Sequence, residues 1–173
     1  MVASGRTAEE KVGILVTKTF RRVAAVSLVL GCVFFGVAVQ ADGPFQYFTL
    51  TPCRVFDTRL VGGPTIGNPL DDQSISTFVV QGNCGIPMGA KAVTVNITAV
   101  SPAGQGHFRV YPSGLPRPAV STLNFPAGTG ALANGAIVPL ADQLVEAEDM
   151  SVFSKVVGGG GVHMILDVTG YFE

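Results

Sequence analysis

The chain has 173 residues, a length with room for one domain rather than two. Of these residues 47% are hydrophobic, and the formal net charge is −1. Residues 42–173 carry six Lys and Arg against ten Asp and Glu, a formal charge of −4, and no basic block. This balance lacks the electrostatic footprint of a nucleic-acid-binding groove, and we expect no nucleic-acid partner.

The first 41 residues have the organisation of a secretory signal peptide. Residues 1–22 are polar and mixed in charge, as in an n-region, and residues 23–39 form an uncharged apolar run. The tripeptide Val39-Gln40-Ala41 then offers small residues at the positions that a signal peptidase reads. We expect a signal helix that is removed, which leaves residues 42–173 as one secreted domain with no membrane attachment.

Two other readings of this segment stay open. The apolar run is at the short end of what can span a bilayer, so residues 23–39 could remain as an uncleaved anchor. Alternatively, Cys32 follows Val-Leu-Gly, which loosely resembles a lipidation site. All three readings export the domain.

From Phe45 onward, short runs rich in β-branched and aromatic residues alternate with turns rich in Gly and Pro. The pattern is clearest where Val93, Val95, Ile97 and Ala99 alternate with their neighbours, which predicts a strand with one face in a core. The expected strands are residues 45–50, 53–59, 74–80, 93–100, 107–111, 121–125, 132–140, 150–157 and 162–172. Residues 142–149 could add a short strand or one helical turn.

These runs recur about every ten residues, and no long helical pattern follows the signal segment. Such spacing favours an antiparallel sandwich or barrel. We predict an all-β fold, an antiparallel β-sandwich of about nine to ten short strands. A turn at residues 101–106 predicts that the strands on either side form a hairpin, and the four glycines 158–161 predict a second, terminal hairpin.

Two cysteines, Cys53 and Cys84, remain after the signal segment. An even pair in an exported domain predicts a disulfide. A metal site built on the two thiols would need further ligands at suitable spacing, and only His107 and His163 are available. We therefore expect no metal and no cofactor.

Charged residues recur near the first and last expected strands. Asp57 and Arg59 lie two apart, on one face of an extended segment, and Asp167 lies inside an apolar run where a lone carboxylate is costly. We expect Asp167 to pair with Arg54 or Arg59 and to tie the last strand to the first. The alternative makes Asp57 and Asp167 the carboxylate couple of a glycoside hydrolase, although nothing marks one as acid and the other as nucleophile.

Six segments carry ordered motifs: TPCRVFDTR (51–59), CGIPMGAKAVTVNITAV (84–100), GHFRVYPSG (106–114), RPAVSTLNF (117–125), ANGAIVPL (133–140) and HMILDVTGYF (163–172). Together they resemble a module of secreted bacterial proteins in which these motifs recur in this order. The match covers almost all of the chain after the signal segment. The resemblance implies an all-β exported module, often attached to or repeated beside other domains, and assigns no biochemical role.

No catalytic signature is present: there is no G-x-S-x-G, no H-E-x-x-H and no phosphate-binding glycine loop. We expect a protein that is not an enzyme. The first hypothesis is a module that binds cell-envelope or extracellular polysaccharide through loops 61–72, 112–118 and 158–161, because recognition usually lies on loops of a rigid scaffold. The candidate ligand residues are Tyr111, Ser113, Arg117, Asp71 and Asp72.

A glycan site usually uses aromatic platforms. The chain has no Trp, which leaves Tyr47, Tyr111, Tyr171 and the phenylalanines. The second hypothesis is a structural or assembly module of the cell surface, with a cell-surface protein as partner and exposed strand edges as the means of contact. A cryptic glycoside hydrolase is the third and least supported.

Overall fold

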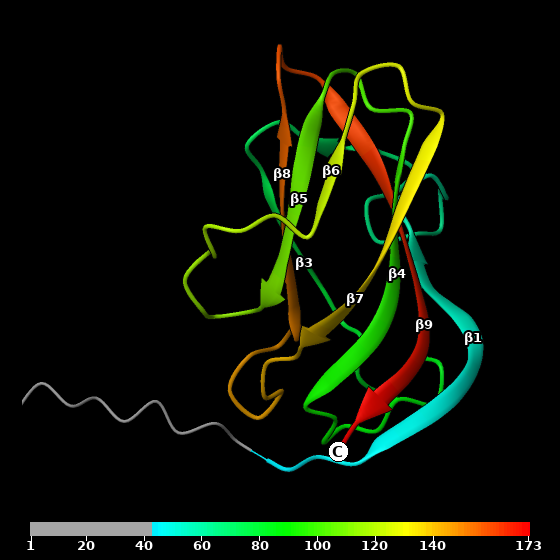
Figure 1. Ribbon diagram of the computed structural model, residues 1–173, viewed down its shortest axis with the longest axis vertical. Coiled ribbons are helices and arrows are strands. Elements are labelled where there is room, and N and C mark those ends of the chain that lie inside the picture. The colour runs from blue at the N-terminus through cyan, green and yellow to red at the C-terminus, as the bar shows by residue number, and fades with distance from the viewer. Residues whose placement is uncertain (1–42) are drawn as a thin grey trace, which may run out of the picture. The chain divides into compact units, whose positions relative to one another are not determined.

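The computed structural model describes residues 43–173, which contain nine strands. The expected signal peptide, with its alternatives of an anchor at residues 23–39 and lipidation at Cys32, lies outside the described residues. Within residues 43–173 there is no helix, and hence none that is long and apolar enough to span a membrane. The prediction of an all-β sandwich is confirmed (Figure 1).

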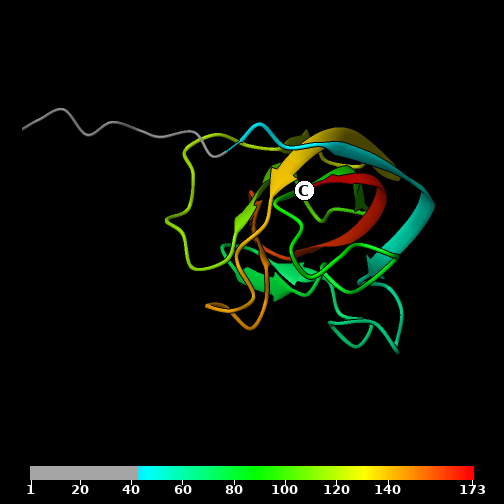
Figure 2. The ribbon, with the colours of Figure 1, turned by 90° about the horizontal axis from the view of Figure 1, so that it is seen from below.

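The strands form two antiparallel sheets. The first sheet has the order β1-β9-β4-β7, with β2 paired to the start of β9, and the second has the order β3-β8-β5-β6. The bounds are β1 Tyr47–Asp57, β2 Leu70–Asp71, β3 Ile75–Phe78, β4 Ala92–Val100, β5 Gly106–Pro112, β6 Leu123–Phe125, β7 Ala131–Pro139, β8 Met150–Val156 and β9 Gly161–Phe172. Viewed along the strands, β1, β9, β4 and β7 curve around one side of the core (Figure 2).

The core lies between the two sheets and is built from the inward-facing residues of both. In β4, the buried residues are Val93, Val95, Ile97 and Ala99, as the period-two pattern predicts. Phe56 of the first sheet stacks on Phe78 of the second, with ring centroids 4.1 Å apart. Burial of these apolar faces is the main source of the fold's stability.

Neither predicted hairpin forms. β4 pairs with β7 and β9, whereas β5 pairs with β6 and β8, so the turn at residues 101–106 carries the chain from one sheet to the other. β8 and β9 likewise lie in different sheets. The alternation of apolar residues defines which face of a strand is buried but does not define its partner, so a hairpin and a crossing between sheets have the same local pattern.

Three further expectations are corrected. The expected strands 45–50 and 53–59 are one strand, β1, which continues past the proline between them. β1 is at the sheet edge, and its pairing with β9 shifts register between Thr49 and Cys53 and then resumes. Pro52 lies in this irregular stretch and removes no ladder bond that the sheet needs. The expected loop 61–72 contains the short strand β2, and residues 142–149 are turns, neither strand nor helix.

The predicted disulfide between Cys53 and Cys84 is present. It joins edge strand β1 to the connection between β3 and β4, across 31 residues of sequence, with the two Cα atoms 5.9 Å apart. In the chain-entropy description, closing a loop of that length stabilises the folded state by roughly 3 to 4 kcal/mol.

Reduction of this disulfide should therefore lower the free energy of unfolding by roughly 3 to 4 kcal/mol. The measurement is urea unfolding with and without a thiol reductant. A double variant, Cys53→Ser with Cys84→Ser, is the control, because it should be less stable from the outset and indifferent to reductant. An unchanged unfolding midpoint on reduction would contradict this account of the bridge.

Candidate functional site

The three loops predicted to contact a ligand do not converge. Loop 61–72 lies beside the loop that ends at Gly160, because the Asp72 N–H donates to the Gly160 carbonyl and β2 pairs with the start of β9. Loop 112–118 begins at the opposite end of β5, where Pro112 pairs with Met150. The length of β5 separates loop 112–118 from the other two loops, so the three loops do not form one site.

Two of the predicted ligand residues are inaccessible. Tyr111 and Ser113 are buried, and the Ser113 hydroxyl lies 3.0 Å from the hydroxyl of Ser151. The chain after β5 folds back along that strand, where Arg109 Nη1 donates to the Pro118 carbonyl at 3.0 Å. The expectation that Tyr111 and Ser113 face a ligand is wrong, because both residues are buried.

The other three predicted ligand residues are not buried, and two of them, Asp71 and Asp72, are adjacent in the chain. Arg117 is exposed and places its guanidinium 4.0 Å from the centre of the Phe153 ring. Asp71 is an exposed residue of β2. Asp72 accepts the Val156 N–H at 2.8 Å and the Lys155 Nζ at 3.0 Å, and these contacts lower the pKa of Asp72. Asp72 thus fastens β2 to β8 rather than facing outward.

The four predicted ion-pair residues meet in one network formed by β1, the turn that follows it and β9. Arg54 Nε lies 2.8 Å from Asp167 Oδ1 and Arg54 Nη2 lies 3.2 Å from Asp167 Oδ2, a two-pronged contact between directly opposite residues. Arg54 Nη1 also reaches Asp57 Oδ2 at 3.4 Å, and Arg59 holds Asp57 through its Nε at 2.8 Å. The pair that joins the first and last strands is Arg54 with Asp167.

The two carboxylates of this network differ in environment. The Asp57 side chain is 1% exposed, whereas the Asp167 side chain is 26% exposed on the outer face of the sheet. Asp167 is therefore only partly buried, although apolar residues flank it in the sequence. Hydrogen bonds from the Arg59 side chain lower the pKa of Asp57 from 3.8 to about 2, although burial opposes the shift. An Asp57 that stays ionised is poorly suited to donate a proton to a leaving group.

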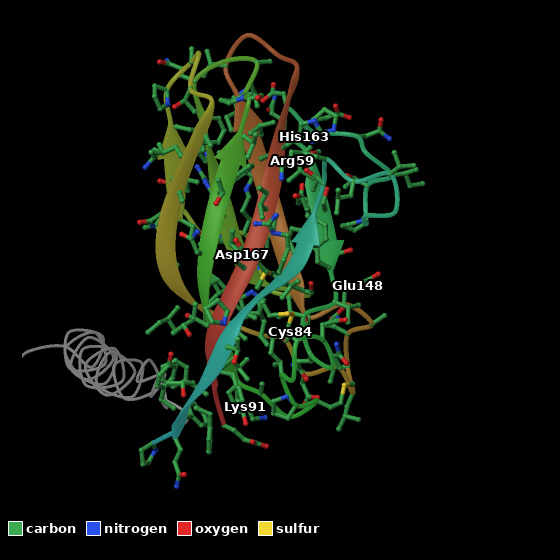
Figure 3. All side chains as sticks on the ribbon, turned by 90° about the vertical axis from the view of Figure 1, so that its right-hand side faces the viewer. Arg59, Cys84, Lys91, Glu148, His163 and Asp167 are labelled. Carbon is green, nitrogen blue, oxygen red and sulfur yellow. A yellow bond between two sulfur atoms is a disulfide. The ribbon has the colours of Figure 1, made fainter. Side chains whose placement is uncertain are left out.

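The outer face of the first sheet carries an open groove of about 490 Å³ beside this network. It is lined by Pro52, Cys53, Arg54, Asn96, Asp167 and Thr169. Asn96 and Arg54 flank Asp167 on the two neighbouring strands. Figure 3 looks onto this side of the molecule, with Asp167 near the middle of β9, beside β1. Hydrogen-bonding groups from three adjacent strands therefore share one surface.

An aromatic ring is connected to the groove through the hydroxyls of two threonines. Tyr47, which is 47% exposed, packs over Gly170, where a Cβ atom would lie 2.6 Å from a Tyr47 ring carbon. The Tyr47 hydroxyl is 3.2 Å from Thr94 Oγ1, which in turn accepts the hydroxyl of Thr169 at 3.2 Å. A glycine at position 170 is therefore required for the ring to lie on the sheet, and the hydroxyl chain holds the ring beside the groove.

Thr94, Asn96 and Thr169 did not emerge as site residues from the sequence. The sequence of β4 did contain an indication of Thr94 and Asn96, because the residues that alternate with its buried face are largely polar. It was missed because a polar outer face is the ordinary condition of an antiparallel strand in water. Thr169 is the residue at which the pairing of β9 with β4 changes register, which local sequence does not reveal.

Two other groups of polar residues serve the fold. Asp149 is fully buried and accepts the backbone N–H groups of Val80 at 2.8 Å and Gln81 at 2.6 Å, so it replaces ladder bonds at the end of β3. On the outer face of the second sheet, burial, followed by the positive charges of Arg109, Lys155 and Arg117, lowers the pKa of His107. Within residues 43–173, no group of three or more His, Cys, Asp or Glu side chains could hold a metal ion.

No protein-family model matches the chain, and no curated protein matches it. Among solved structures, the chain is similar to the coat protein of Tobacco streak virus in two crystal structures. The TM-score is 0.38 for both, with 15% and 14% sequence identity, and the alignments cover 76% of this chain and 90% and 89% of the viral chains. Likeness at this level carries no argument about function.

The two carboxylates should contribute very differently to stability. Asp57→Asn should lower the free energy of unfolding by roughly 2 to 4 kcal/mol, because it removes a buried charge that Arg59 and Arg54 need. Asp167→Asn should cost less than about 1 kcal/mol, because that pair is partly exposed. Urea unfolding of both variants at neutral pH measures the difference, and equal losses would contradict the assigned roles.

The pH dependence follows from the lowered pKa of Asp57. Because the folded-state pKa is about 2 and the unfolded value is about 4, the stabilisation is complete above pH 4 and is lost as the pH falls toward 2. The loss amounts to roughly 2 kcal/mol. We expect the stability difference between the wild type and Asp57→Asn to shrink over this range, and a difference independent of pH would be inconsistent with an ionised Asp57.

Proposed function

We propose that the protein is a non-catalytic module that binds an extracellular or cell-envelope glycan across the outer face of the first sheet. The observation that carries the proposal is the half-exposed Tyr47 ring, which packs over Gly170 and lies beside a groove of paired hydrogen-bonding side chains. The site differs from the loop site expected from the sequence because its residues lie on strands.

The chemistry of the groove suits a sugar. A pyranose presents C–H groups on its faces, which pack on an aromatic face, and hydroxyl groups around its edge, which both donate and accept hydrogen bonds. Beside the Tyr47 ring, Arg54 supplies donors, Asp167 supplies acceptors, and Asn96 supplies both. These groups can therefore meet hydroxyls of either polarity.

The charges of the site favour a neutral glycan. Arg54 and Arg59 balance Asp57 and Asp167, so the network has no net formal charge. A uronic acid, sulfate or phosphate group would gain no net Coulomb attraction from it. We infer a neutral polysaccharide as the ligand class.

The site is also held in place before any ligand arrives. The Tyr47 ring is fixed by Gly170 beneath it and by the hydroxyl of Thr94, and Arg54 is fixed by two carboxylates. A site on rigid strands loses less conformational entropy on binding than a site on mobile loops. This supports the outer face of the sheet, rather than loops 61–72 or 112–118, as the binding surface.

Assembly at the cell surface is the second candidate function. The observation that favours it is the edge strand β7, which is long, uncharged and largely exposed. Export to the cell surface or medium is part of both proposals, and the disulfide supports it because such bonds persist in oxidising compartments.

The test is retention by polysaccharide. In native gels cast with a panel of neutral and acidic polysaccharides, the wild-type protein should be slowed by at least one neutral polymer. Tyr47→Ala should weaken that binding by about tenfold or more, because it removes the stacking surface. Tyr47→Phe is the matched control, since it keeps the ring and removes only the hydroxyl, and it should bind within a few-fold of the wild type.

The fold of each variant is checked by its unfolding midpoint, which the exposed position of Tyr47 should leave nearly unchanged. Equal retention of Tyr47→Ala and wild type would exclude the outer-face site. Retention by no polymer in the panel would count against glycan binding itself.

A further inference from the structure

Three of the four sheet edges are protected against pairing with another chain. β3 and β6 are only four and three residues long. β1 contains Pro52, two irregularities in its pairing and a disulfide to the neighbouring connection. Short edges, prolines and bulges are the usual means by which β-proteins block edge-to-edge association.

The fourth edge, β7, has none of these protections. Ala131–Pro139 spans nine residues and pairs with β4 without a register shift over its full length. It carries no charged residue, and its only proline is the last residue. Seven of its nine residues are exposed, with Ile137 at 62%.

The outer edge of β7 also has free hydrogen-bonding groups. In an antiparallel ladder, alternate residues direct both backbone groups to the same neighbour, so half of the strand faces away from β4. Among residues 43–173, no backbone group of β7 bonds to anything other than β4. This edge is a template for one more strand.

We propose that β7 pairs antiparallel with β7 of a second copy of this chain, which joins the two first sheets into one continuous sheet across a two-fold axis at Gly135. This inference rests on the assembly function and is independent of the glycan site.

The sequence of β7 supports a second copy as the occupant. Pairing about Gly135 places Leu132 opposite Val138 and Ala133 opposite Ile137, so each larger side chain meets an apolar partner and no like charges meet. At the axis, two glycines leave space for close approach of the strands. Because the arrangement is two-fold and the far edge of the sheet is the protected β1, association stops at a dimer.

The dimer should be weak. A single strand pair buries less than the roughly 1,200 to 2,000 Å² of a standard interface, so we expect an equilibrium that depends on concentration. In the joined sheet both outer faces lie on one surface, which would present two Tyr47 grooves to one polymer.

The test is sedimentation velocity at low salt on the exported form of the full chain, from about 10 µM to about 1 mM. The wild-type sedimentation coefficient should rise with concentration. Gly135→Lys and Gly135→Asp should each lower the association constant by about tenfold or more, because like charges then meet at the axis. An added Cβ at Gly135 has room, since its nearest neighbour is the Val95 carbonyl oxygen at 3.9 Å.

An equimolar mixture of Gly135→Lys and Gly135→Asp should restore dimers, because opposite charges then meet at the axis. Gly62→Lys is the matched control, since it adds the same charge in a loop where a Cβ has nothing within 4 Å, and it should associate like the wild type. A wild type that is monomeric throughout overturns the proposal and leaves β7 to a strand of another protein.

A wild-type dimer that both charged variants leave intact, or a mixture that stays monomeric, also overturns the two-fold pairing at Gly135. Tyr47→Ala should dimerise like the wild type, so loss of glycan binding and loss of association are measured separately.

Discussion

The pairing of β1 with β9 is the constraint on which the candidate site depends. β1 is an edge strand with a proline and two irregularities, so its backbone ladder alone fixes it poorly. The disulfide at Cys53, the buried Asp57 held by Arg59, and the Arg54 contact with Asp167 each add an attachment. Because Tyr47 and Arg54 both lie on β1, the shape of the groove depends on these attachments.

Sequence reasoning succeeded where the determinant is local or has few possible partners. The alternation of Val93, Val95, Ile97 and Ala99 predicted the buried face of β4, and the two cysteines that follow the expected signal segment allow only one bridge between them. It failed where the partner is distant: the chain crosses between sheets from β4 to β5, and Tyr111 is buried although it lies at the end of an expected strand, beside a loop predicted to contact a ligand. Tyr47 was named as an aromatic, but its platform depends on Gly170, more than a hundred residues away.

The groove and the β7 edge belong to the same sheet and so have linked consequences. Asn96, which lines the groove, is paired with Gly135, at the centre of the proposed contact between copies. A dimer of this kind would hold two weak sites at a fixed spacing, and binding to a repetitive polymer would then gain from effective concentration. The dimer would therefore bind the polymer strongly even where a single groove binds it weakly.

In our proposal the outer face of the first sheet, rather than the loops, binds the ligand. An NMR titration of the ¹⁵N-labelled protein with an oligosaccharide from a retaining polymer tests it most directly. We expect the shifted amides to cluster around Tyr47, Asn96 and Asp167. Shifts confined to loops 61–72 and 112–118, or to the outer face of the second sheet, would contradict the account.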